Sequence, residues 1–258
     1  MTLAARALAG LLLGLGCLLA WGSPPQRVVS LDLCMDWALA HHAERAQVAA
    51  LSPLHRRYPI PWLGTDWPTH DGSLEQVVSL RPDLVLAGQY SALALRQRLQ
   101  ALGVRVEVLP LPTSLAEVET YERRILTLLG GDPAQARPAP APRRPAADAP
   151  TLLLLGANGI GTGAGTFEDQ ILVQAGWRNY LDSPGYVALD LEALAASPPD
   201  AILFAAPPAQ ALANRFAEHP VLRRAVPPQA WLSTDYWRWQ CPGAWTWDLI
   251  GQLHRWLD

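Results

Sequence analysis

A unit of short helix, proline and buried strand occurs twice in this 258-residue chain, and this repeat constrains the fold more than any other feature. In the first copy, Leu74, Val77 and Val78 have helical spacing, which predicts one buried helix face. Ser73 has the position of an N-cap residue before this helix. Pro82 ends the helix, and the apolar run behind it is short enough for a buried strand.

The second copy begins at Asp190 and has the same parts in the same order, ending in an apolar run over residues 201–205. Each copy carries one glutamate in the first turn of its helix, Glu75 and Glu192. Each glutamate follows the first apolar position, so its side chain is expected to point away from the buried stripe. The repeat predicts two related halves, each of which presents one glutamate.

The composition excludes some classes of function. Half of the residues are hydrophobic, which is ample for packed cores, and the formal net charge of −3 offers no basic surface for nucleic acid. No Ser-His-Asp or Cys-His set stands in the context of a nucleophile. We therefore expect no nucleic-acid partner and no catalytic residues.

The N-terminus has the features of a secretory signal. Residues 8–20 form an apolar core, and residues 20–22 form a small-x-small cleavage site. The core is shorter than the roughly 20 residues that span a bilayer, so cleavage is favoured over a membrane anchor. Cys17 is a poor site for lipid attachment because Gly14 stands where an aliphatic residue is needed. This pattern predicts a periplasmic protein that begins after residue 22.

Removal of the signal leaves two cysteines, Cys34 and Cys241. An even pair in an exported chain is compatible with a disulfide in an oxidising compartment. Two buried thiols are the alternative, and connectivity does not follow from sequence.

Strands alternate with helices through both halves, which predicts an α/β fold with parallel-type sheets flanked by helices. In such sheets, ligands bind at the carboxyl ends of the strands. The segment 52–72 lacks apolar periodicity and is rich in aromatic residues and histidine, so it is expected to be a long functional loop. The expected strands are 27–31, 48–51, 84–88, 104–109, 151–155, 201–205 and 230–233. The expected helices include 36–46, 92–102, 114–129, 166–175 and 210–218.

A proline-rich segment over residues 133–150 separates the two halves. Prolines at this density exclude a helix and favour an extended, semi-rigid spacer. The predicted domains are a signal peptide (1–22), an N-terminal lobe (23–112), a connecting helix with its proline-rich linker (113–150) and a C-terminal lobe (151–258).

The order and spacing of these pieces resemble the periplasmic substrate-binding proteins whose two α/β lobes are joined by one helix. That family delivers cobalamin, iron–siderophore complexes or haem to ABC importers, and its cobalamin-binding members look most similar. The resemblance implies a monomeric binding protein that has no resident cofactor. The resemblance covers nearly the whole chain from Arg27 onward. It is carried by residues 27–31, 74–75, 82–86, 103–104, 163–169, 175–179, 191–192 and 199–200.

The resemblance implies roles for the two glutamates of the repeat. In the family, the matching glutamates stand on the rim of each lobe and dock against arginines of the transmembrane subunits. Glu75 and Glu192 occupy those positions. The alternative is that each complements the dipole of its own helix, worth about 0.3–1 kcal/mol.

The resemblance also places a ligand between the lobes, and aromatic walls suit flat macrocycles because they bury large areas and stack. The candidate ligand-binding residues are Tyr58, Trp67, Tyr90, Tyr186 and Trp237. Ordinary packing is the alternative for each. We assign Trp62, Trp239, Trp245 and Trp247 to packing.

One segment departs from the family pattern. Family members continue the connecting helix well beyond the position of Gly130 and across both lobes, whereas here the proline-rich segment replaces about half of it. The fixed spacing of the lobes, or greater freedom between them, is therefore left open.

A dinucleotide-binding enzyme is a rival interpretation, because Gly159, Gly161 and Ala164 fit a G-x-G-x-x-G/A pattern. An exported chain lacks a soluble nicotinamide pool, and the acidic residue at the required distance, Asp182, stands in a turn. The backbone N–H groups at the following helix start are an alternative binding site for an anionic ligand edge.

A metal-binding protein is a second rival. It would use histidines, but the adjacent His41 and His42 are expected to face apart on a helix, so no metal site is predicted. Haem ligation by Tyr58, His55 or His70 stays open, since a haem pocket needs only one axial donor. A sensor or interaction domain with the same fold is a further alternative.

Overall fold

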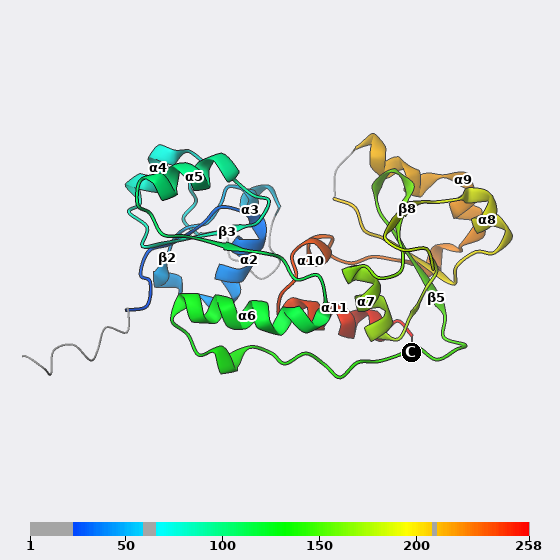
Figure 1. Ribbon diagram of the computed structural model, residues 1–258. Coiled ribbons are helices and arrows are strands. Elements are labelled where there is room, and N and C mark those ends of the chain that lie inside the picture. Colours follow the sequence, from blue (N-terminus) through cyan, green and yellow to red (C-terminus); the bar gives the residue numbers. More distant parts are fainter. Residues whose placement is uncertain (1–22, 59–65, 208–210, 258) are drawn as a thin grey trace, which may run out of the picture.

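The computed structural model describes residues 23–58, 66–207 and 211–257. The predicted signal segment with Cys17 lies outside these residues, as does Trp62. The described chain forms two α/β lobes that lie side by side, with helix α6 and an extended segment along one side of the molecule (Figure 1). In the described ranges, none of the helices has the length and hydrophobicity that crossing a bilayer requires.

The N-terminal lobe contains a four-stranded sheet in the order β2-β1-β3-β4, and all of its strand pairs are parallel, as the sequence predicts. Helices α2 and α6 pack on one face, and α4 and α5 pack on the other. The strands are β1 (Val28–Ser30), β2 (Val48–Ala50), β3 (Leu84–Gly88) and β4 (Val106–Leu109). The helices are α2 (Leu33–His42), η1 (Arg45–Gln47), α3 (Leu54–Arg57), α4 (Leu74–Ser79), α5 (Leu93–Ala101) and α6 (Leu115–Leu129).

The C-terminal lobe contains a sheet in the order β10-β9-β5-β6-β8, with β7 paired to β5. Strands β5, β9 and β10 run parallel, as expected for a parallel-type sheet, whereas β6 pairs antiparallel with both β5 and β8, so one edge of this sheet is antiparallel. Its strands are β5 (Thr151–Leu155), β6 (Ile160–Thr162), β7 (Arg178–Asn179), β8 (Tyr186–Ala188), β9 (Ala201–Phe204) and β10 (Trp231–Leu232).

Helices also cover both faces of the C-terminal sheet. Helices α7 and α11 pack on one face, and α8 and α9 pack on the other. The α-helices are α7 (Phe167–Ala175), α8 (Leu191–Ala196), α9 (Pro220–Ala225), α10 (Trp237–Gln240) and α11 (Trp245–His254). The remaining short helices are η2 (Pro133–Gln135), η3 (Ala157–Gly159), η4 (Leu212–Glu218) and η5 (Pro228–Ala230), so the helix expected at 210–218 is a 3₁₀ helix.

The repeated unit forms α4 followed by β3 in one lobe and α8 followed by β9 in the other. The aspartate of each copy fastens the start of the neighbouring central strand. Asp83 accepts a hydrogen bond from the backbone N–H of Arg27 (3.0 Å), and Asp200 accepts one from that of Thr151 (2.7 Å). The repeat thus places equivalent hydrogen bonds in both sheets. The predicted buried stripe on α4 is narrower than expected, because Val78 is 37% exposed.

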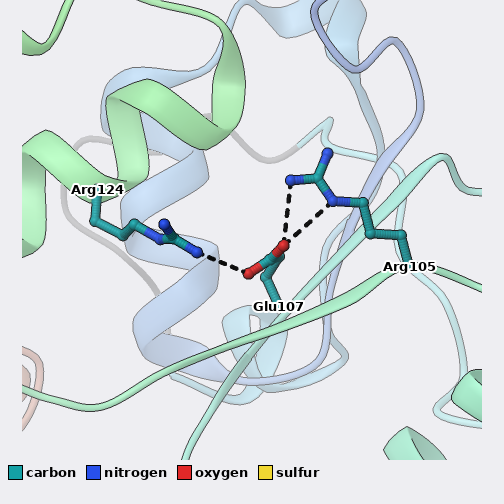
Figure 2. Close-up of polar contacts among 3 residues, drawn as sticks. All are labelled: Arg105, Glu107 and Arg124. Atoms are coloured by element: carbon teal, nitrogen blue, oxygen red, sulfur yellow. Dashed lines mark hydrogen bonds and ion pairs between the residues drawn. The ribbon is translucent and has the colours of Figure 1, made fainter. Parts of the chain in front are cut away.

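Helix α6 is shared by the two lobes. Its C-terminal half, with Ile125 and Leu129, packs into the N-terminal core, whereas Val118 near its start packs into the C-terminal core. Glu107 on the edge strand β4 binds Arg124 of α6 at 3.0 Å and Arg105 at 3.2 Å, as Figure 2 shows. The helix therefore bridges the lobes although it is only 15 residues long.

The helix ends at Gly130, whose φ of 78° lies in the left-handed region that favours glycine. A Cβ atom here would lie 2.6 Å from the side chain of Pro24. A residue with a side chain is therefore excluded twice at this position, by backbone conformation and by space. The chain then turns back and runs beneath α6 towards the C-terminal lobe (Figure 1).

The proline-rich segment is extended, as predicted, but it is attached to the helices along its length. The backbone N–H of Ala139 donates to Glu119 of α6 (3.1 Å), and Gln174 of α7 donates to the carbonyl of Ala141 (2.8 Å). Arg137 forms an ion pair with Asp248 of α11 at 2.8 Å. The segment is a docked strap beneath the lobes and not a free spacer.

A disulfide joins Cys34 of α2 to Cys241 after α10, with the Cα atoms 4.9 Å apart. Around it, Trp37 and Trp245 pack edge to face with their ring centroids 5.1 Å apart. This apolar cluster attaches the C-terminal segment of the chain to the N-terminal lobe. The packing role predicted for Trp239, Trp245 and Trp247 is confirmed, because all three are buried.

Candidate ligand-binding site

The candidate site is built from loops at the carboxyl ends of the strands. In the N-terminal lobe, these loops follow β1, β2 and β3, and in the C-terminal lobe they follow β5, β9 and β10. Parallel strands end at the same edge of a sheet, so the side chains on such loops converge. The aromatic residues of interest lie on these loops or next to them.

Two of the predicted ligand-binding residues meet where the lobes join. The ring of Tyr58, after α3, lies 4.3 Å from that of Trp237 on α10, measured between ring centroids. The ring of Tyr236 packs edge to face against that of Trp237, with the centroids 4.9 Å apart. All three rings are partly exposed, so they form an aromatic surface with contributions from both halves of the chain.

A pocket of about 210 Å³ adjoins this aromatic surface in the C-terminal lobe. Tyr186 on β8 and Glu168 on α7 line it, and the Tyr186 hydroxyl donates to Glu168 Oε2 at 3.0 Å. Burial raises the pKa of Glu168. Burial and then the Glu168 charge raise the pKa of Tyr186 to about 12. Tyr236 lines the same pocket, with Trp239 as a buried wall.

Sequence reasoning missed Glu168 and Tyr236. Glu168 lies in the run Thr166-Phe167-Glu168-Asp169 at a helix start, where an acidic residue is ordinary. Only the position of β8 brings Tyr186 to it. The sequence does contain a signal for Tyr236, because this aromatic residue directly precedes Trp237.

The other two predicted ligand-binding residues lie apart from this pocket. Tyr90 follows the carboxyl end of β3 and is 88% exposed, a position suited to a wall of the N-terminal lobe. Trp67 lies two residues before Thr69, which forms an isolated bridge with Leu51, and its side chain packs against the N-terminal core. The guanidinium of Arg45 lies 4.3 Å from its ring, so one face of Trp67 is already covered.

A buried polar network holds the loop that carries Tyr58. Asp36 of α2 accepts hydrogen bonds from the hydroxyl of Ser30, from the backbone N–H of Ser52 (2.7 Å) and from the Ser52 hydroxyl (2.6 Å). Burial nevertheless raises the pKa of Asp36 to about 7. This network ties the ends of β1 and β2 to α2, which fixes the base of the loop.

The two loop histidines have structural roles. His55 Nδ1 donates to the carbonyl of Ser52 (2.7 Å), and His70 Nε2 donates to that of Ser30 (2.7 Å). His70 Nδ1 accepts from the backbone N–H of Gly72 (3.0 Å), so this ring is neutral, and burial lowers its pKa. Neither ring nitrogen of His70 is available to a metal, and both histidines are buried.

The glycine-rich loop does not form a dinucleotide-binding turn. Strand β6 stands between β5 and α7, whereas the fingerprint requires a strand that leads directly into a helix. The helix start is also occupied, because Thr166 Oγ1 accepts from the backbone N–H of Asp169 (3.1 Å) and Asp169 accepts from that of Gly165 (2.9 Å). Gly163 is required for packing, since a Cβ there would lie 2.0 Å from the carbonyl oxygen of Ser183.

Glu75 and Glu192 are both exposed on helices that cover the outer sheet faces, on the side away from α6 (Figure 1). Other residues cap these helices. Ser73 accepts from Gln76, and Asp190 accepts from the N–H groups of Glu192 and Ala193. Within the described residues, neither glutamate side chain has a hydrogen bond or an ion pair.

The expectation that His41 and His42 face apart is wrong. Helix α2 ends at His42, and the two imidazole rings lie edge to face with their centroids 4.6 Å apart. His42 Nε2 lies 3.2 Å from Glu122 of α6. These residues lie at the α2–α6 packing face, away from the pocket of Glu168 and Tyr186.

Comparison with solved structures defines the fold. A periplasmic haem-binding protein from Pseudomonas aeruginosa superposes with a TM-score of 0.66 at 22% identity, over 90% of this chain and 92% of that one. A periplasmic haem-binding protein of Vibrio cholerae gives 0.68 at 16%, over 90% and 98%. The periplasmic vitamin B12-binding protein of Vibrio cholerae gives 0.61 at 15%, over 91% and 97%. No protein-family model and no curated protein sequence matches the chain.

The chain therefore has the two-lobed fold of periplasmic substrate-binding proteins. The likeness extends over more than nine tenths of each of those structures. At these identities it defines the architecture, which is that of binding proteins, and leaves the ligand undetermined.

Proposed function

We propose that this chain is an extracytoplasmic substrate-binding protein that captures a corrinoid or a similar bulky metal chelate and delivers it to an ABC importer. The observation that carries the proposal is the aromatic surface of Tyr58, Tyr236 and Trp237 where the lobes join. Flat, apolar macrocycles gain affinity from such surfaces through area and stacking. The solved structures with this fold that are named above bind haem or vitamin B12.

A haem or ferric siderophore cargo is the alternative. Haem needs one axial donor from the protein. Both histidines of the loop are buried and hydrogen-bonded. Tyr186 would have to bind as phenolate, which the Glu168 charge beside it opposes. They leave the partly exposed phenols of Tyr58 and Tyr236 as axial donors for haem, whereas a corrinoid, whose metal carries most of its own ligands, needs none.

The experiment is a titration of the purified exported protein with cyanocobalamin, haemin and a ferric siderophore, followed by visible absorption and tryptophan fluorescence. We expect saturable one-to-one binding of one of them at micromolar concentration or below. Replacing Trp237 by alanine should weaken that binding by more than tenfold, whereas Tyr180→Phe, on the outer side of the C-terminal lobe, should not. Failure of all three ligands to bind would overturn the proposal.

We infer that Glu75 and Glu192 dock the loaded protein on the importer. Their carboxylates are exposed, and neighbouring residues already cap their helices, so helix stability does not require them. Exposed rim charges steer association with a partner of opposite charge. The double variant Glu75→Arg/Glu192→Arg should keep ligand affinity and lose stimulation of the importer ATPase. Glu218→Arg, at another exposed glutamate, is the control and should leave the stimulation unchanged. Unchanged stimulation in the double variant would contradict the assignment.

A further inference from the structure

A cluster of three potential metal ligands lies outside the candidate ligand-binding site, at the junction between α2, α6 and α11. His41 and His42 end α2, and Glu122 stands in the middle of α6. The donor atoms of these three side chains all lie within 4.8 Å of one another. Asp248 of α11 lines the same cavity of about 220 Å³.

Glu122 is the residue that requires an explanation. Its side chain is 1% exposed, and neither carboxylate oxygen has a hydrogen-bond partner. A buried carboxylate without hydrogen bonds is costly, and buried charges in native proteins are paired or bind metals. His42 Nε2 at 3.2 Å supplies at most one contact, so the second oxygen is left without any partner.

We propose that His41, His42 and Glu122 form a divalent-metal site of the zinc class. Two imidazoles and one carboxylate are a ligand set that zinc and its neighbours in the first transition row bind readily. Zinc–ligand bonds of about 2.0–2.2 Å put the donor atoms of a tetrahedral site about 3.4 Å apart. The Glu122 oxygen and the His42 nitrogen are 3.2 Å apart, close to that spacing. A donor atom of His41, at the exposed end of the helix, lies within 4.8 Å of both, so a rotation of its side chain would be needed to close the set.

The cavity supplies the fourth position. Asp248 faces it but is 63% exposed and bound to Arg137 at 2.8 Å, so either a water molecule or this carboxylate completes the coordination. Arg137 belongs to the proline-rich strap, and its guanidinium is engaged by Asp248. The ion would therefore tie α2 of the N-terminal lobe to α6 beside the segment that returns the chain to the other lobe.

The test uses the full exported chain without an affinity tag, stripped with a chelator and then titrated with Zn²⁺ or Co²⁺. We expect one ion per chain, the visible absorption bands of four-coordinate Co²⁺, and a rise in Tm with Zn²⁺, since a ligand that binds only the folded state stabilises it. His41→Ala should weaken binding at least tenfold and abolish the rise in Tm. His219→Asn, which keeps an N-cap residue on α9, should do neither.

His41→Ala separates this proposal from a simple ion pair between His42 and Glu122, because His41 is not part of that pair and lies at the exposed end of α2. Glu122→Gln is a second variant, in which we expect the same loss of Zn²⁺ binding. The absence of stoichiometric binding at micromolar Zn²⁺ would overturn the proposal. So would Zn²⁺ affinity that is the same in the wild type and in His41→Ala.

Discussion

The two lobes are alike on their outer faces and different where they meet. Each outer face carries a short capped helix with an exposed glutamate, and in each an aspartate fastens the central strand. At the junction, the C-terminal lobe adds the antiparallel strands β6 and β8, which bring Tyr186 to Glu168. In the N-terminal lobe, the strands that the structure describes are all parallel, and Tyr90 lies at a strand end. The repeated features suit a symmetric partner surface, and the unrepeated features suit one asymmetric ligand.

The segments that connect the lobes also differ from one another. The connecting helix is short, and the return path is a docked proline-rich strap, but the C-terminal segment crosses back to α2 through Cys241 and Trp245. The disulfide closes a loop of 207 residues. The C-terminal lobe is therefore attached to the rest of the molecule at both of its chain ends, by α6 and the strap before β5 and by the disulfide and its apolar cluster near the C-terminus.

The largest expected effect comes from removing this crossing. Cys34→Ala/Cys241→Ala should lower the free energy of unfolding by about 2–5 kcal/mol, because the long loop is no longer closed in the unfolded chain. Urea unfolding followed by tryptophan fluorescence measures the loss. If the cluster around Trp245 alone holds the lobes together, the loss will stay below about 0.5 kcal/mol. A reducing agent should have no further effect on the double variant.

The next effect comes from the N-terminal lobe, where burial raises the pKa of the Asp36 carboxyl group to about 7. The pKa of Asp36 is higher in the folded protein than its ordinary value of 3.8, so the folded state binds more protons between these values. Stability should therefore fall as the pH rises from about 4 to 7. Asp36→Asn should flatten this dependence, because asparagine does not ionise and the Ser52 hydroxyl can turn to accept from its amide.

Urea unfolding at several pH values checks this prediction through the difference between wild type and variant. The free energy of unfolding of the wild type, relative to that of the variant, should be largest near pH 4 and should decrease towards pH 7. A difference that is constant from pH 4 to pH 7 would show that the hydrogen bonds from Ser30 and Ser52 keep Asp36 ionised.

A smaller effect tests the unrepeated pocket of the C-terminal lobe. Tyr186→Phe keeps the ring but removes the hydrogen bond to Glu168, and a single hydrogen bond contributes about 0.5–1.5 kcal/mol. Tyr186 is 64% exposed, so the low end of that range is expected. The same bond lowers the pKa of Glu168, so its loss should raise that pKa further. NMR titration of the Glu168 carboxyl carbon measures this pKa. An unchanged pKa in the variant would show that the Tyr186 hydroxyl does not stabilise the Glu168 carboxylate.

The sequence predicted the features that repeat or that have a strong local signal. The α4–β3 and α8–β9 units, the helix over 114–129 and the end of that helix at Gly130 all follow from spacing and from helix stop signals. The short strands β6 and β8 were not predicted, because three residues beside glycines are too few to show a period of two. The role of Glu168 was not predicted either, since its hydrogen-bond partner Tyr186 lies 18 residues further on, in β8. The docking of the proline-rich strap depends on contacts with Glu119 and Gln174, and composition alone does not reveal such contacts.

The smallest expected effect concerns how α6 is held by the N-terminal lobe. Glu107→Gln removes the charge that binds Arg105 and Arg124, but these arginines are 54% and 57% exposed, and exposed ion pairs contribute about 0–1 kcal/mol. The loss of stability should be within that range at low salt and should vanish at about 1 M salt, where charges are screened beyond about 3 Å. A loss that persists in high salt would mean that Glu107 acts through packing. Because Ile125 and Leu129 bury the same helix in the core, the apolar face and not the ion pairs should keep α6 shared between the lobes.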